Sequence, residues 1–201
     1  MSLNTNHEVG LEHEFEKVIG ARLREQRERL GISQREVARR TGCSPSLISQ
    51  IENGLSRPSV STLYSLVTEL GLSLDEAFGA VEHRAVARID HQRVVHPDDR
   101  AVLTLESRVR WERLTATSED GLDFLYVVYE VGGASGDGDT LMRHSGREHG
   151  LVTSGRLEVQ VGFDHHSLGP GDSISYDSTT PHRLWNEGSE PAHGIWVVIG
   201  R

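Results

Sequence analysis

The chain has 201 residues, of which 36% are hydrophobic and 25% charged, so it is long enough for one large or two small domains. No apolar run reaches the roughly 18 residues of a membrane span, and the single cysteine excludes an internal disulfide, so we expect a cytoplasmic protein without a membrane partner. The net charge of −9 is unevenly spread, because residues 17–58 carry nine Lys and Arg against four Glu. A basic segment joined to an acidic remainder is expected when only one part of a protein meets phosphates.

The first part of the chain follows the pattern of short helices, each bounded by its own start and stop signals. Apolar residues recur at helical spacing, capping residues open most segments, and Gly or Asn-Gly closes them. We therefore expect five helices, over 15–31, 33–42, 44–54, 61–71 and 73–79. The apolar face predicted for the first helix contains Phe15, Ile19, Leu23 and Leu30.

From about Gly79 the composition changes. Residues 80–104 have mixed charge and no steady period, which predicts a linker that includes a candidate first strand. Beyond residue 100 the pattern is strand-like, as in "LDFLYVVYEV" and "HGIWVVIG", with Gly and Pro turns typical of a β-sandwich or barrel. We therefore predict a two-domain α + β chain, with an all-α domain over 12–79, the linker over 80–104 and an all-β domain over 105–201.

Two short helices joined by a tight turn are the layout of helix-turn-helix proteins, whose second helix enters the DNA major groove. Through "ARLREQRERLGISQREVARRTGCSPSLISQIENGLSRPS" the chain resembles the phage-repressor-type (XRE) helix-turn-helix family. The resemblance implies a five-helix, lambda-repressor-like fold and a double-stranded DNA operator as partner. Because one such domain contacts only a half-site, we also expect a homodimer that pairs through its β-domain.

The helix over 44–54 divides into an inward apolar face and an outward polar face. The resemblance implies that the outward side chains reach base edges, and the amide of Gln50 can form a bidentate pair with adenine. Neighbouring polar residues are placed for phosphates, which position a protein without reading sequence. The expected DNA-binding residues are Pro45, Ser46, Ser49 and Gln50 at bases, and Gln34, Ser44, Asn53 and Arg57 at phosphates. The family also implies an internal ion pair between Arg27 and Glu52.

The β half contains a possible metal site in "HSGREHG", residues 144–150. His144 and Glu148 are four residues apart, so both point to the same side of an extended segment, whereas His149 points away. Barrel closure can bring His182 to them. Two histidines and one carboxylate form a facial triad that binds Fe(II) and also accepts Zn, Mn or Ni. We therefore predict one divalent metal ion at His144, Glu148 and His182, with the glycines of this segment serving turns.

The same segments resemble the cupin family, which implies a double-stranded β-helix, or jelly-roll barrel, over about 105–201. Met142 stands where the family's first histidine is expected, and its thioether is too soft a ligand to replace that histidine for a hard cation. The resemblance therefore implies a site with three protein ligands. The residues that match the two cupin motifs are His144, Glu148, Gly155, Pro170, Gly171, His182 and Asn186.

A DNA-reading domain joined to a cupin resembles a large group of bacterial regulators, in which the barrel binds an effector or a metal and alters operator affinity. We expect such a regulator, with no catalytic residues. One alternative is a non-haem iron oxidase or epoxidase, because the layout and the three-ligand site also resemble hydroxypropylphosphonate epoxidase. Another is a metal-free barrel that serves only dimerisation. The polar reading face favours a regulator, whose effector pocket we expect to be lined by Tyr126, Met142, Tyr176 and Trp185.

Overall fold

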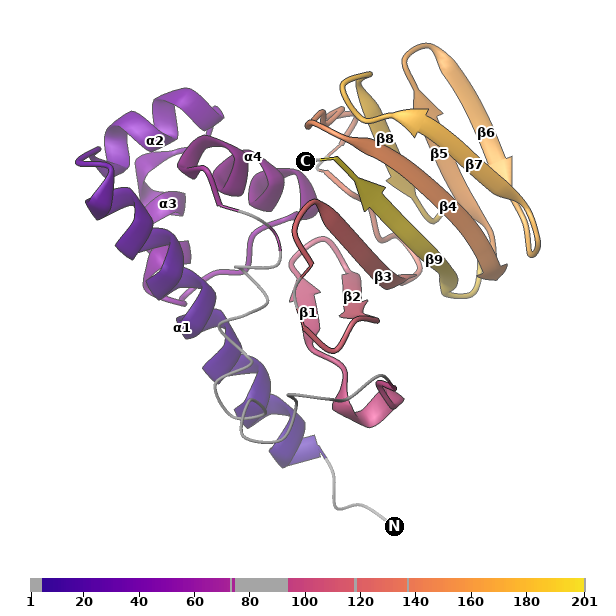
Figure 1. Ribbon diagram of the computed structural model, residues 1–201, viewed down its shortest axis with the longest axis horizontal. Helices are drawn as coiled ribbons and strands as arrows, with labels where there is room; N and C mark the ends of the chain where they lie inside the picture. The colour runs from indigo at the N-terminus through magenta and orange to yellow at the C-terminus, as the bar shows by residue number, and fades with distance from the viewer. Residues whose placement is uncertain (1–4, 73, 75–93, 118, 137, 201) are drawn as a thin grey trace.

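The computed structural model describes residues 5–72, 74, 94–117, 119–136 and 138–200, as a helical unit followed by a β-unit (Figure 1). The helices are α1 (Thr5–Arg29), α2 (Gln34–Thr41), α3 (Pro45–Glu52) and α4 (Val60–Leu70). The side chains of Ser33, Ser44 and Ser59 each accept a hydrogen bond from the amide three residues on, which satisfies a free amide at the start of α2, α3 and α4. The part of the chain described here thus has four α-helices, and the predicted fifth helix, 73–79, lies outside it except for residue 74.

The helical unit packs its apolar side chains into one core. Ile19 and Leu23 of α1 are buried as predicted, but Leu30 is 50% exposed. The prediction for Leu30 was wrong because α1 ends at Arg29, and the chain turns away at Gly31 with a φ of 67°. Gly20 lets α1 approach α3, since a Cβ there would lie 2.2 Å from the carbonyl oxygen of Ile51.

The β-unit contains nine named strands in the described residues, preceded by a short 3-10 helix over Pro97–Asp99. Six strands pair antiparallel in the order β1-β2-β3-β9-β4-β7, and three in the order β6-β5-β8. Their bounds are β1 (Val102–Leu105), β2 (Val109–Arg113), β3 (Leu122–Tyr129), β4 (Arg147–Ser154), β5 (Leu157–Val161), β6 (Asp164–Leu168), β7 (Ser173–Asp177), β8 (His182–Trp185) and β9 (Ala192–Ile199). The first strand therefore begins three residues before the predicted start of the β-domain at 105.

Burial alternates along β1, β8 and β9, as expected for strands with one inner and one outer face. In β9, for example, Trp196 and Val198 are buried, whereas Val197 is half-buried and Ile199 is 48% exposed. The inner faces form the core of the β-unit. The described helices include none with the length and apolar character of a membrane crossing.

The start of α4 joins the helical unit to the β-unit, and Figure 1 shows α4 beside the sheets. The amide of Ser61 donates to the carbonyl of Ser135 at 2.7 Å, and the amide of Glu106 donates to the carbonyl of Pro58 at 3.2 Å. The Tyr64 ring meets Trp111 of β2 edge-on, with ring centroids 5.7 Å apart. The buried apolar residues of both units form one continuous cluster, so the two units share a core.

Candidate functional site

Three side chains predicted as metal ligands meet inside the β-unit. The Nε2 atoms of His144 and His182 lie 2.9 and 3.1 Å from the same oxygen, Oε1 of Glu148. All three side chains are almost completely buried, with at most 3% of each exposed. The structure thus brings together three residues that span positions 144 to 182 of the sequence.

The three residues of this cluster lie on different parts of the β-unit. Glu148 lies on β4 and His182 begins β8, but His144 precedes β4 instead of sharing an extended strand with Glu148. A turn at Gly146, where φ is 104°, separates the two. The amide of His144 donates to the carbonyl of Ser178 at 3.0 Å, which holds His144 beside the end of β7. The expectation of one extended segment was therefore wrong in its geometry, although both side chains do point inward.

Hydrogen bonds to the backbone place a proton on Nδ1 of each of the two histidine rings. His144 Nδ1 lies 2.9 Å from the carbonyl of Ser145, and His182 Nδ1 lies 2.8 Å from the carbonyl of Thr180. Because a carbonyl can only accept, each Nδ1 carries a proton, and in the neutral form of each ring Nε2 then keeps its lone pair. The two Nε2 atoms and Glu148 Oε1 are buried and form no hydrogen bond of acceptable geometry. Three unpaired acceptors that converge in this way fit a cation.

The other oxygen of Glu148 is held by two donors. Tyr176 Oη and Trp196 Nε1 each donate to Oε2 at 2.7 Å. Burial acts to raise the pKa of Glu148, but when the two histidines are protonated their hydrogen bonds and charges outweigh burial and hold that pKa well below its ordinary value. Burial and the charge of Glu148 raise the pKa of Tyr176, which keeps its hydroxyl protonated as a donor. Glu148 is thus an oriented carboxylate with Oε1 directed at the histidines.

A small cavity of about 20 Å³ adjoins this cluster, roughly the space of one water molecule. Met142 and Glu148 line it, together with the aromatic residues Tyr64, Trp111, Tyr129 and Trp196. Met142 therefore lines the cavity. Tyr176 contacts the cluster by its hydrogen bond to Glu148. In this conformation the cavity has room for about one water-sized ligand beside the cluster.

Two of the four residues expected in the effector pocket point away from it. The Tyr126 hydroxyl is 2.8 Å from His193 Nδ1, on the outer face of the six-stranded sheet. Trp185 lies on the outer face of the three-stranded sheet, stacked on His165 with Arg183 over its ring. Both predictions were wrong because the strand register, which the sequence does not display, decides the face.

Sequence reasoning also missed cavity residues. Trp111 and Tyr129 alternate with outward residues on β2 and β3, and the register of these strands would have been needed to find them. Tyr64 comes from α4, so no pattern within the β half could indicate it. Its ring stacks on His144, with centroids 4.0 Å apart and planes 1° from parallel.

The remaining residues of "HSGREHG" divide as follows. His149 faces outward, where its Nδ1 lies 2.8 Å from Ser175 Oγ, in agreement with the prediction. Gly146 serves a turn, but Gly150 does not, because it pairs with Trp196 in the middle of β4. A Cβ at Gly150 would lie 2.2 Å from the Trp196 ring, so this glycine makes room for the indole that donates to Glu148.

The second candidate site is the outer side of α3. Ile48 and Ile51 are buried against the helical core, whereas Pro45, Ser46 and Gln50 are exposed and Ser49 is half-buried. Ser44 is the N-cap of α3, and Asn53 closes the helix with its Nδ2 donating to the Ser49 carbonyl at 2.7 Å. Arg57 is half-buried in the following loop. The arrangement leaves a small, polar surface along the outer side of α3, as DNA reading requires.

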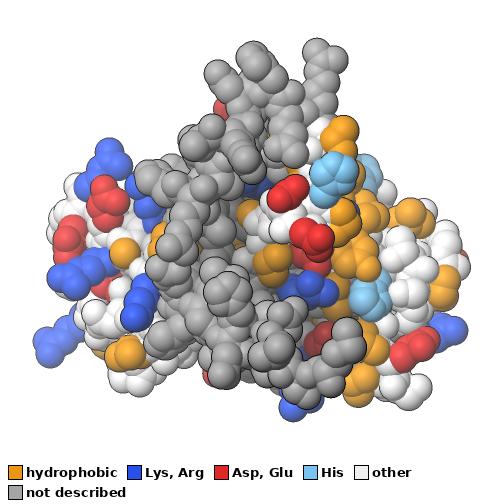
Figure 2. All heavy atoms as spheres, turned by 90° about the horizontal axis from the view of Figure 1, so that it is seen from below, with side chains coloured by type: hydrophobic (Ala, Val, Ile, Leu, Met, Phe, Trp, Pro, Cys, Tyr) orange, Lys and Arg blue, Asp and Glu red, His pale blue; other side chains and the backbone are white. Residues whose placement is uncertain are grey.

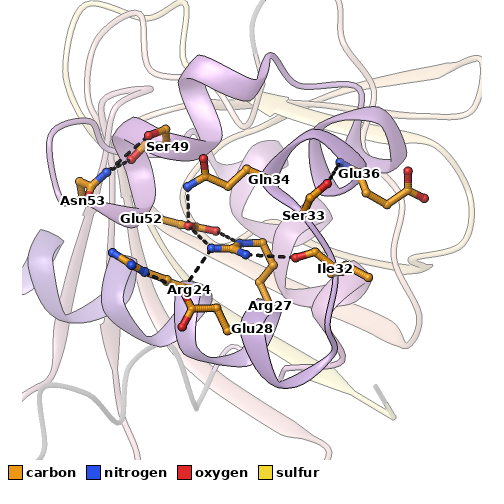
Figure 3. A network of polar contacts seen from close by, with 10 residues as sticks. All are labelled: Arg24, Arg27, Glu28, Ile32, Ser33, Gln34, Glu36, Ser49, Glu52 and Asn53. Atoms are coloured by element: carbon orange, nitrogen blue, oxygen red, sulfur yellow. Dashed lines mark hydrogen bonds and ion pairs between the residues drawn. The ribbon is translucent and has the colours of Figure 1, made fainter.

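The helical unit is braced by the ion pair that the family resemblance implied (Figure 3). Arg27 Nε and Nη2 donate to Glu52 Oε1 and Oε2 at 2.6 and 2.9 Å, and Arg27 Nη1 donates to the Ile32 carbonyl at 3.0 Å. The Glu52 hydrogen bond raises the pKa of Arg27. Gln34 Nε2 also donates to Glu52 Oε2 at 2.8 Å, so this amide, expected at a phosphate, is engaged inside the unit.

Part of the basic charge of the helical unit is neutralised locally. Arg39 and Arg40 both pair with Glu36, and their hydrogen bonds lower the pKa of this carboxyl to about 2. Figure 2 shows Lys and Arg side chains over the helical part and hydrophobic and His side chains gathered over the β-part.

Two family models match the chain, one over each unit. The helix-turn-helix model matches residues 23–76, which include α2, α3 and α4. The cupin domain model matches residues 125–198, which include all three members of the buried cluster. The two models thus describe a helix-turn-helix segment followed by a cupin segment.

Known proteins resemble the chain over most of its length. The HTH-type transcriptional regulator PuuR of Escherichia coli (strain K12) is 30% identical over 169 residues, which cover 83% of this chain and 86% of the relative. An HTH_3 family transcriptional regulator from Vibrio cholerae has 22% identity and a TM-score of 0.68, covering 94% of this chain and 99% of that one. Hydroxypropylphosphonic acid epoxidase from S. wedmorenis has 21% identity and a TM-score of 0.45, covering 92% of this chain and 98% of that one.

Proposed function

Because this chain belongs to the family of HTH-type transcriptional regulators and carries a cupin domain, we propose that its β-unit binds a divalent metal ion and thereby changes operator affinity. The chain is a DNA-binding transcriptional regulator, and the relative matched over most of both chains is a regulator and not an enzyme. Binding to an operator is also consistent with the cytoplasmic location expected from the sequence. This match favours a regulator over the epoxidase alternative.

The converging acceptors at the buried cluster carry the metal proposal. His144, Glu148 and His182 offer ligand atoms that all lie within 4.8 Å of one another. A divalent ion would satisfy these atoms together, whereas protons alone would leave charged rings buried in a nearly dry cavity. Fe, Zn, Mn and Ni all accept two imidazoles and one carboxylate. Such an ion would keep open coordination positions, to which a small-molecule effector could bind.

The outer side of α3 carries the DNA proposal. We place Pro45, Ser46, Ser49 and Gln50 at base edges in the major groove, because these side chains point away from the core on the outer side of α3. Ser44, Asn53 and Arg57 flank this surface and suit phosphates. For Gln34, a phosphate contact would have to use the amide oxygen, since its nitrogen donates to Glu52.

Metal content and operator affinity, measured on the same preparations, test the metal proposal. We expect the wild type to hold about one divalent ion per chain and to change its operator affinity by about 5–150-fold when the ion is removed by a chelator. Glu148→Gln should lose both the ion and the response, because it removes the ligand charge at nearly constant volume. Elemental analysis and fluorescence anisotropy with DNA upstream of its own gene provide the readouts.

The matched control for Glu148→Gln is Glu158→Gln, which alters a second buried carboxylate, on β5 and bonded to Ser167 and His165. This variant should keep the metal and the operator response. Metal content that is unchanged in Glu148→Gln would contradict the assigned ligands. Loss of the ion without any change in operator affinity would contradict a regulatory role for the metal.

We further propose that two copies pair through the outer face of the six-stranded sheet. Apolar side chains form adjacent cross-strand rows there, because Ile195 lies opposite both Tyr126 and Leu151, and Val197 lies opposite Phe124. Leu151 is 42% exposed and the others are half-buried. Such a face is costly to leave in water. A second copy is the expected occupant, because one helix-turn-helix unit contacts only half of a near-palindromic operator.

A charge placed at the centre of this face tests the dimer. Ile195→Asp should shift the protein from dimer to monomer in analytical ultracentrifugation and weaken operator binding, since a carboxylate buried at an apolar interface is unpaired. Phe163→Asp is the control, because Phe163 is fully exposed and lies at the turn between β5 and β6, away from the face. A wild type that sediments as a monomer, or a dimer that survives Ile195→Asp, would argue against this interface.

A further inference from the structure

We propose that Tyr64 of α4 is the positioning residue that couples the buried metal cluster to the DNA-binding unit. Its ring is the part of the helical unit that lies directly on a proposed metal ligand, His144. The inference rests on the proposed function, because it concerns how occupancy of that site reaches the operator-binding helix. It assigns Tyr64 no direct contact with the ion.

The geometry makes the orientation of His144 depend on Tyr64. The two rings are parallel, with centroids 4.0 Å apart. The His182 ring also contacts the His144 ring, edge-on, with centroids 5.3 Å apart. The His144 side chain is 1% exposed, so protein side chains and not solvent surround it. An ion that draws Nε2 toward a fixed bond length would therefore move the Tyr64 ring with the imidazole.

Tyr64 is rigidly connected to the rest of the helical unit. It follows Leu63 in the middle of α4, and Leu63, Leu66 and Val67 are buried at 2% exposure or less. The helix α4 also packs on α2, which packs on the reading helix α3. A displacement of the Tyr64 ring would therefore move α4, and the helices packed on α4 would move the reading helix α3 with it.

A second contact links the start of α4 to the strand that carries His182. Ser61 donates its amide to the carbonyl of Ser135, and Ser135 is fully buried. The Ser135 hydroxyl accepts from the amide of Leu184, which lies on β8 and lines the cavity. The helix is thus held at Ser61 while its Tyr64 ring contacts His144, an arrangement that favours rotation of α4 about its first turn.

Three variants test this coupling when operator affinity is measured with and without Zn²⁺. Tyr64→Phe keeps the stacked ring and should keep the wild-type effect of the ion. Tyr64→Leu removes the ring and should reduce that effect to less than about twofold, while Zn²⁺ and operator still bind separately. Trp185→Leu removes a ring stacked on another histidine of the same barrel, His165, and should keep the effect.

The outcomes separate this inference from the proposed function. A full zinc effect in Tyr64→Leu would overturn the role of Tyr64 and leave the metal-linked regulator intact. A wild type whose operator affinity ignores bound Zn²⁺ would overturn both. By linkage, operator DNA must also change the Zn²⁺ affinity of the wild type by the same factor, and Tyr64→Leu should lose this reciprocal effect.

A second measurement does not depend on whether Tyr64→Leu folds. An aromatic ring stacked on an imidazole shifts the NMR signals of the imidazole protons, so histidine-labelled wild type reports the contact directly. Operator binding should change the His144 signals and leave those of His165, which is stacked on Trp185, unchanged. His144 signals that stay constant on operator binding would overturn the proposal.

Discussion

Arg27→Ala is expected to lower the free energy of unfolding by about 3–5 kcal/mol, because it removes one partner of a buried ion pair. Arg27 bonds both oxygens of Glu52 and also the Ile32 carbonyl, which joins α1, α3 and the turn before α2. Without the guanidinium, the Glu52 carboxylate stays buried with Gln34 as its remaining described side-chain donor. Urea unfolding followed by circular dichroism measures the loss.

The exposed pair Arg24–Glu28, with a 2.9 Å contact on the same helix, provides the control. Arg24→Ala should cost much less than Arg27→Ala, because solvent already screens that pair. The double variant Arg27→Met/Glu52→Leu should recover much of the stability, since it leaves no unpaired charge. Equal costs for Arg27→Ala and Arg24→Ala would show that burial of the first pair has no energetic consequence.

Gly150→Ala is expected to destabilise the β-unit by about 3 kcal/mol, at the upper end of the range for overpacking. Its Cβ would lie 2.2 Å from the Trp196 ring, which is 4% exposed and held by its hydrogen bond to Glu148. The ring has to move, so Glu148 Oε2 loses a donor. We therefore also expect metal affinity to fall by about 10–100-fold, as for other residues that orient a ligand. Thermal unfolding and zinc titration measure the two effects.

Gly169→Ala is the matched control, because a Cβ at Gly169 would meet only side-chain atoms at 3.7 and 3.8 Å, which are ordinary contacts. This change should leave stability within about 1 kcal/mol of the wild type. Trp196→Leu in the Gly150→Ala background should recover part of the stability, since it removes the clashing ring. A Gly150→Ala protein with unchanged stability and zinc affinity would contradict the assigned role of this glycine.

Local signals were sufficient to predict the starts of α2 and α3. Ser33 and Ser44 cap α2 and α3 as expected, because a capping hydrogen bond spans only three residues. The Arg27–Glu52 pair was implied by the family resemblance and is confirmed by the contacts. The end of α1 was less predictable, since Leu30 matches the apolar spacing but lies beyond the last helical residue.

The metal ligands could be named from the sequence because their chemistry is carried by residue type. His144, Glu148 and His182 meet as predicted, but the path between the first two turns at Gly146 instead of following one strand. The direction of Tyr126 and Trp185 could not be predicted, because a strand pattern gives two faces and only the pairing of strands decides which one is inner.

The sequence by itself determined the caps of the short helices, the charge difference between the two units and the identity of the three ligand side chains. These properties depend on residue type and on neighbours within one turn or one motif. Only the tertiary structure decided that Gly150 makes room for Trp196 and that Tyr64 stacks on His144. Those contacts join segments far apart in the chain, and they exist because two packed units share one core.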